Sequence, residues 1–168
     1  MTETPNSRPS TLWKQMTAAQ RRGAAEAFWR EDTPSAEQAE AVGLIAERLH
    51  FRPKSVMGMP LERRVRALAS TSTLSETLAA SLLVAYHLAS QRPMMSAFLD
   101  ALGIPHEDGL IAEDVTPQID EARLDEAVGR VRASFPEEDV SLYFATLAMQ
   151  DPATWTALGR FQQDRKGA

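Results

Sequence analysis

The chain has 168 residues, of which 43% are hydrophobic and 24% are charged, and it contains no cysteine. This composition is typical of a globular domain rather than a disordered chain, and the lack of thiols excludes disulfides, thiolate metal sites and cysteine nucleophiles. The formal net charge of −5 disfavours general nucleic-acid binding. We expect a cytoplasmic protein.

The charge is unevenly distributed along the chain. Residues 1–70 carry 11 Lys and Arg against 8 Asp and Glu, and residues 71–168 carry 7 against 15, so +3 and −8 sum to the net −5. Opposite charge on the two halves makes intramolecular or head-to-tail pairing a reasonable hypothesis.

The two ends of the chain are expected to be tails around one helical domain. Residues 1–10 are polar with two prolines, which predicts a flexible tail rather than a signal peptide or an anchor. Residues 11–163 are expected to form a single helical domain, and residues 164–168 a frayed C-terminal tail. The most apolar stretch, residues 78–89, is about 12 residues long where a membrane span needs roughly 20.

Helical spacing of apolar residues dominates the first half. A helix over residues 12–30 contains the capping-box pair Thr17 and Gln20, which indicates a break there. The next helix places Leu49 on its apolar face with Ile45. The same capping-box spacing at Thr73 and Glu76 predicts the start of a helix that reaches about residue 91. That helix is apolar nearly all round, so we expect it at the centre of the core.

The second half contains helices and one long connection. Pro93 begins a helix that ends at Gly103, and residues 104–115 lack a helical pattern. Asp108-Gly109 is a hairpin dipeptide, but strand-like runs do not flank it. Thr116-Pro117 is expected to open the next helix, and Pro136 and Pro152 to begin the last two.

The predicted fold is all-α, a compact multi-helix bundle of about seven or eight helices. Residues 88–93 (LASQRP) resemble residues 147–152 (LAMQDP) at an offset of 59, and Pro34 lies another 59 before Pro93, so three helical hairpins are possible. The side chains expected in the core are Phe28, Trp29, Ile45, Leu49, Leu78, Leu82, Tyr86, Phe98, Leu102, Leu124, Val128, Phe135, Phe144 and Leu147.

The strongest surface candidate is a basic segment over residues 48–66, opposed by Glu62 alone. Such a patch can hold an acidic protein, a phosphate or RNA, although Phe51 is its only aromatic residue. We favour the alternative that it pairs with the acidic region 107–126 of the same chain or of a second copy. Its cations, the candidate anion-binding or partner-binding residues, are Arg48, Arg52, Lys54, Arg63, Arg64 and Arg66.

The three histidines are weak candidates for chemistry. Glu47 and His50 form one Glu-x-x-His step, half of a di-iron pattern, and we expect His50 at a helix end. His87 lies in the apolar helix, where a hydrogen-bonded core residue is the commoner outcome. His106 stands among acids whose spacing matches neither an EF-hand nor a zinc site. The pattern predicts no catalytic residue, metal or cofactor.

The favoured function is a non-enzymatic protein-interaction or regulatory module, with a protein partner or self-association. Met57, Met59, Met94 and Met95 are candidates for an adaptable apolar groove. One alternative is an enzyme or metal-binding protein that uses His50 or His87 with nearby carboxylates. Another is a weak nucleic-acid or anion binder through residues 48–66.

Overall fold

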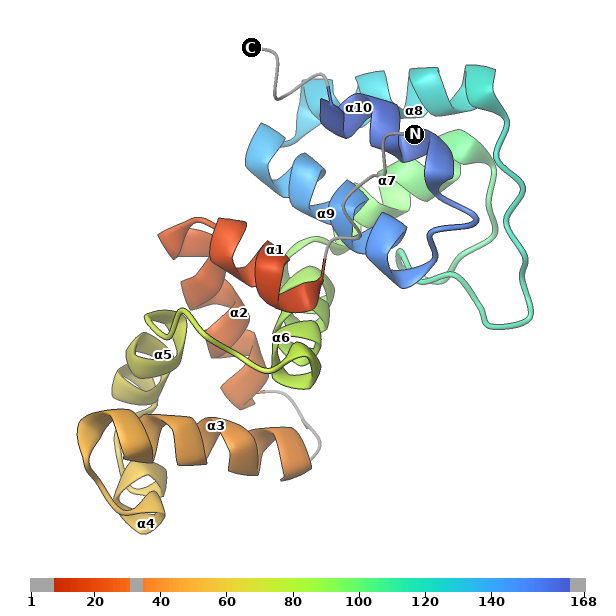
Figure 1. The fold of residues 1–168 in the computed structure, drawn as a ribbon. Helices are drawn as coiled ribbons and strands as arrows, with labels where there is room; N and C mark the ends of the chain where they lie inside the picture. The colour runs from red at the N-terminus through yellow and green to blue at the C-terminus, as the bar shows by residue number, and fades with distance from the viewer. Residues whose placement is uncertain (1–7, 31–34, 164–168) are drawn as a thin grey trace, which may run out of the picture. The chain divides into compact units, whose positions relative to one another are not determined.

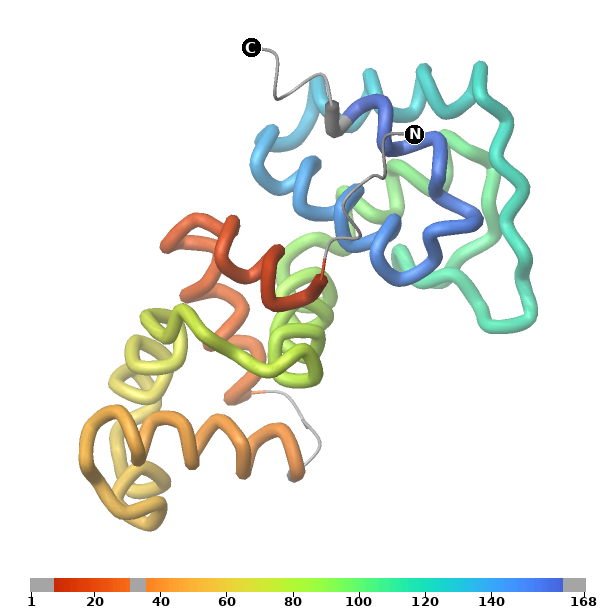
Figure 2. The backbone as a smooth tube through the Cα atoms, in the orientation of Figure 1, coloured from red at the N-terminus to blue at the C-terminus, as the bar shows by residue number. Residues whose placement is uncertain are grey.

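The computed structural model describes residues 8–30 and 35–163, and this part of the chain is all-α (Figures 1 and 2). It contains ten α-helices, eight of them with seven or more residues, and no strand. The all-α prediction is therefore confirmed. No helix in the described ranges is long and apolar enough to cross a membrane.

The helices fall into two compact units, and the boundary between them along the chain lies between Ser90 and Gln91. The N-terminal unit, residues 8–90, holds α1 (Pro9–Gln15), α2 (Ala18–Arg30), α3 (Ser35–Leu49), α4 (Pro53–Met57), α5 (Leu61–Ala69) and α6 (Glu76–Ser90). The C-terminal unit holds α7 (Arg92–Leu102), α8 (Glu121–Ser134), α9 (Glu137–Gln150), the 3₁₀ turn η1 (Thr156–Leu158) and α10 (Gly159–Gln163).

The described residues bear on only part of the expected division into tails and one domain. A single domain over residues 11–163 stays a prediction. Helix α1 begins at Pro9, so Pro9 and Ser10 are helical rather than part of a tail; residues 1–7 and 164–168 lie outside the described residues. Pro93 stands at the start of α7, next to the unit boundary. The three-hairpin repeat also stays a prediction, because Pro34 is not described.

Helix α6 forms the centre of the N-terminal unit, where α1, α2 and α3 pack against it (Figure 1). Leu78, Leu82 and Leu83 are fully buried, as the sequence predicted for this helix. The helix is not covered all round, however, since Val84 keeps 42% of its surface exposed.

The predicted capping box separates α1 from α2. The Thr17 N–H donates to Gln20 Oε1 over 2.9 Å, and the Gln20 N–H donates to Thr17 Oγ1 over 3.1 Å. The second predicted box is wrong. Ser75 caps α6 by accepting the Leu78 N–H, while the Glu76 carboxylate binds the backbone N–H and hydroxyl of Ser10 at the start of α1.

An aromatic cluster fills the core of the C-terminal unit. The Phe98 ring lies 5.0 Å from the Phe144 ring, 5.7 Å from Tyr143 and 5.9 Å from Trp155, centroid to centroid. These rings connect α7 to α9 and to the turn that precedes η1. Burial also raises the pKa of the Tyr143 hydroxyl, so this side chain stays neutral.

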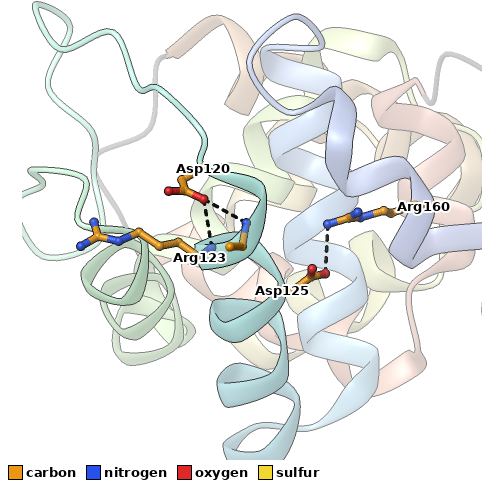
Figure 3. Close-up of polar contacts among 5 residues, drawn as sticks. Asp120, Arg123, Asp125 and Arg160 are labelled. Atoms are coloured by element: carbon orange, nitrogen blue, oxygen red, sulfur yellow. Dashed lines mark hydrogen bonds and ion pairs between the residues drawn. The ribbon is translucent and has the colours of Figure 1, made fainter.

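Helix α8 begins later than the sequence indicated. Figure 3 shows why: one carboxylate oxygen of Asp120 accepts the backbone N–H groups of Ala122 at 2.9 Å and Arg123 at 3.4 Å. Thr116-Pro117 was expected to open this helix, but a strong N-cap at Asp120 moves the start to Glu121. Arg160 of α10 pairs with Asp125 of α8 over 3.0 Å, which ties the last helix to α8.

Eleven of the fourteen expected core residues are buried, and three are not. Trp29 and Phe135 are partly buried, and Phe135 packs against the hydrophobic core of the C-terminal unit. Leu49 is 36% exposed. It is the last residue of α3, where the chain turns away before the helical stripe can complete its contact with the core.

Candidate functional site

Three cations of the basic segment make contacts within the N-terminal unit, and the other three do not form an ion pair among the described residues. Arg48 donates from Nη1 to Ser70 Oγ at 2.8 Å and to the Ala67 carbonyl at 3.3 Å, so it caps the end of α5. The Arg64 guanidinium lies over the Trp29 ring, 5.1 Å from the centroid. Arg66 faces Glu62 at 3.5 Å. These three arginines stabilise the unit.

The other three cations of the segment, Arg52, Lys54 and Arg63, are exposed. None of them has an ion pair within residues 8–30 and 35–163. Arg52 and Lys54 stand on either side of Pro53, the first residue of α4, while Arg63 lies on α5. Their charges are therefore available to a partner.

Exposed apolar side chains lie on both sides of Arg52 and Lys54 in the sequence. Leu49 is 36% exposed, Phe51 43% and Met57 56%. We call residues 49–57 the α3–α4 corner. It contains two exposed cations and no acidic residue, and a surface that mixes large apolar groups with charge of one sign is typical of interaction sites.

The geometry of the α3–α4 corner follows from how α3 ends. His50 adopts a left-handed conformation, φ 57°, and the Phe51 N–H returns to the Ala46 carbonyl at 2.9 Å. This is the Schellman ending, in which a left-handed residue closes the last helical carbonyls. Pro53 then starts α4 at once, and Val56, fully buried, fixes the short helix to the unit. Phe51 and Met57 are thereby kept on the outside.

A second surface, of opposite charge, lies in the C-terminal unit. We call residues 107–114 the acidic loop; it carries Glu107, Asp108, Glu113 and Asp114, all exposed, and no Lys or Arg. These four side chains have no ion pair within the described part of the chain. Leu110, in the middle of the loop, is 44% exposed.

Residues 107–110 of the acidic loop form a two-residue hairpin turn. Glu107 and Leu110 exchange two backbone hydrogen bonds of 2.8 and 3.0 Å around Asp108 and Gly109, whose φ angles are 53° and 90°. Positive φ at both central residues is the type I′ turn that Asp-Gly favours. The sequence did not predict a hairpin because strand-like runs are missing, and the structure has a single bridge there instead of strands.

His106 fixes one side of the hairpin and is fully used in doing so. Its Nδ1 accepts the Gly109 backbone N–H at 3.0 Å, so the ring proton must sit on Nε2, which donates to Asp100 at 2.6 Å. A histidine–carboxylate pair resembles half of a catalytic triad. Here the second nitrogen is bound to the backbone, so the ring has a positioning role.

The other two histidines lie in unlike environments. His87 is 5% exposed, and its Nδ1 is 2.8 Å from the Leu83 carbonyl one helical turn earlier. His50 is exposed at the end of α3, as the sequence predicted for a helix-end residue. Within the described ranges, no group of three or more His, Asp or Glu side chains is placed to hold a metal ion.

Neither the predicted methionine groove nor an open groove of the C-terminal unit offers a strong ligand site. Met59, Met94 and Met95 are buried in the cores of their units, and of these four methionines Met57 alone is exposed, so the prediction of a methionine groove is wrong. An open groove of the C-terminal unit has one charged group, Glu121, among small and apolar side chains. Its lining residues are Pro117, Ile119, Glu121, Ala153, Thr154, Thr156 and Ala157.

Sequence reasoning did not group the exposed apolar side chains of the α3–α4 corner, and it named Met57 only as a candidate for the methionine groove. Leu49 fits the stripe of α3, and Phe51 was weighed only as a possible stacking group. The available signal was the order of residues 49–54, in which apolar and cationic side chains are interleaved just before a helix-starting proline.

Comparison of the chain with protein-family models, with curated proteins and with solved structures finds no match in any of the three.

Proposed function

We propose that the chain is a cytoplasmic, non-enzymatic protein-interaction module that binds its partner through the α3–α4 corner. The observation that carries this proposal is the coincidence of three exposed large apolar side chains with two unpaired cations in nine consecutive residues. Aromatic, methionine and arginine side chains are the types enriched at protein interfaces.

Magnitudes indicate which side chains supply affinity. Fully burying a large apolar side chain is worth roughly 1.5–3 kcal/mol, so covering the exposed half of Leu49, Phe51 and Met57 is worth on the order of 2–4 kcal/mol. An exposed ion pair adds about 0–1 kcal/mol. The apolar groups therefore provide most of the binding energy, while Arg52 and Lys54 steer the partner and select its charge.

The same features support protein binding over the two alternatives. Nucleic-acid binding would have to rely on Arg52, Lys54 and Arg63 with Phe51 as the one exposed aromatic residue, in a chain of net charge −5. Chemistry at a histidine would have to use His87, which is buried, or His50, which is exposed but is not part of a group of three potential metal ligands within the described residues. Both ring nitrogens of His106 are occupied.

Site-specific photo-crosslinking tests the proposal. A photoreactive residue at Met57, 56% exposed, is expected to give a protein adduct of defined mass in cells. The same residue at Val84, 42% exposed on α6, is the matched control and is expected to give none. The double variant Arg52→Glu, Lys54→Glu should lose the Met57 adduct. Equal adducts at both positions, or none at Met57, would refute the proposal.

A further inference from the structure

Exposed apolar side chains concentrate in two segments of opposite charge. Among the described residues, five large hydrophobic side chains are exposed, and four of these belong to the α3–α4 corner or the acidic loop. The α3–α4 corner has Leu49, Phe51 and Met57 with two unpaired cations. The acidic loop has Leu110 with four unpaired carboxylates.

The turn over residues 107–110 of the acidic loop is held in one conformation. The type I′ turn is closed by two backbone hydrogen bonds, His106 holds the Gly109 N–H, and Arg92 Nη1 donates to the Asp108 carbonyl at 3.2 Å. Gly109 itself is buried against Met95. A surface that is ordered before binding loses little conformational entropy when it docks.

We propose that the occupant of the α3–α4 corner is the acidic loop of a second copy of this chain, an inference that rests on the surface assigned under the proposed function. Leu110 of one copy would lie against Phe51 and Met57 of the other, and the four carboxylates would face Arg52 and Lys54. Both complementary surfaces belong to the same chain, so they are always present at equal concentration.

The contact joins different surfaces of two identical chains. It is therefore heterologous, and it closes into a dimer only when two such contacts form reciprocally between the same pair of molecules. With a few apolar side chains and exposed charges, we expect a weak association. Salt should weaken it, because the ion pairs are screened.

Sedimentation equilibrium of the purified full-length chain gives the first test. The weight-average mass should rise with protein concentration at low salt and fall toward the monomer value of 18.5 kDa in high salt. A monomer mass at every concentration in low salt would overturn the proposal, as would an association that salt does not change. This measurement needs no variant, so it does not depend on how a variant folds.

Charge-reversed variants test which surfaces meet. The double variant Arg52→Glu, Lys54→Glu and the double variant Glu113→Lys, Asp114→Lys should each lose at least about tenfold in association constant. Mixed in equal amounts, the two should regain association, since one contact again carries complementary charge. All four side chains are exposed and unpaired in the described residues, so the substitutions should leave each unit folded.

Arg22→Glu is the matched control, because Arg22 is exposed on α2 and lies outside both surfaces. It should associate like the unaltered chain. If neither double variant changes the association, or if mixing restores nothing, the acidic loop is not the occupant.

The outcomes separate this inference from the proposed function. Photo-crosslinking from Met57 to a different protein, in a chain that stays monomeric, would retain the α3–α4 corner as the binding surface and reject the second copy. The absence of both the adduct and self-association would reject both proposals.

Discussion

At the scale of single residues, glycine at position 109 determines whether the acidic loop can form. Its φ is +90°, and a Cβ built there would lie 2.7 Å from the Met95 Cβ. Both conditions disfavour an L side chain, the first through backbone strain and the second through a close contact with the core of the C-terminal unit. Gly129, by contrast, lies within α8, where an added Cβ would meet nothing within 4 Å.

Gly109→Ala is therefore expected to lower the free energy of unfolding by about 2–4 kcal/mol, from backbone strain and overpacking together. Gly129→Ala should instead raise it by about 1 kcal/mol, since alanine is the better helix former. Denaturant unfolding of both variants checks the pair. A Gly109→Ala variant as stable as the unaltered chain would mean that the hairpin and its contact with Met95 are wrongly described.

At the scale of elements, helix ends explain both what could be predicted and what could not. The Thr17–Gln20 capping box was predictable because its partners are local in sequence. The start of α6 was not predictable, because Glu76 binds Ser10, 66 residues away, and Ser75 rather than Thr73 is the cap. Leu49 was misplaced for a similar reason, since a helical stripe does not show where a Schellman ending turns the chain.

The contact between α1 and α6 is expected to depend on pH. Hydrogen bonds from the Ser10 side chain and backbone hold the pKa of Glu76 below its ordinary value of 4.5. The charged carboxylate thus stabilises the fold above that pH, and the stabilisation is lost as the pH falls through the lowered pKa.

Ser10→Ala tests this dependence, because other carboxylates titrate equally in both proteins. The stability difference between the unaltered chain and the variant should be largest at neutral pH and should shrink below pH 4.5. Urea unfolding at a series of pH values gives that difference directly. A difference independent of pH would contradict the role assigned to Glu76.

The position of α6 in the core is testable with two residues of the same helix. Leu82 is fully buried and Val84 is 42% exposed. Leu82→Ala should cost about 2–5 kcal/mol in the free energy of unfolding, and Val84→Ala less than about 0.5 kcal/mol. Similar costs at the two positions would mean that α6 does not face the core as described.

At the scale of the whole molecule, sequence patterns predicted the fold class and a basic and an acidic region. They did not show which residues of those regions are exposed and unpaired. Apolar periodicity was enough to predict an all-α chain, and the uneven charge was visible by counting. Which cations remain available depends on tertiary contacts, such as those of Arg48 with Ser70 and of Arg64 with Trp29. The division between units at Ser90 and Gln91 likewise depends on packing.

The methyl resonance of Met57 gives the most direct measurement of the central claim, that the α3–α4 corner binds a second copy. With ¹³C-labelled methionine methyls, and Met57→Leu to assign the signal, we expect this resonance to shift as protein concentration rises and to return in high salt. The resonance of Met94, fully buried, should stay in place. A chain whose mass rises while the Met57 resonance stays constant would associate through another surface, and the claim would be wrong.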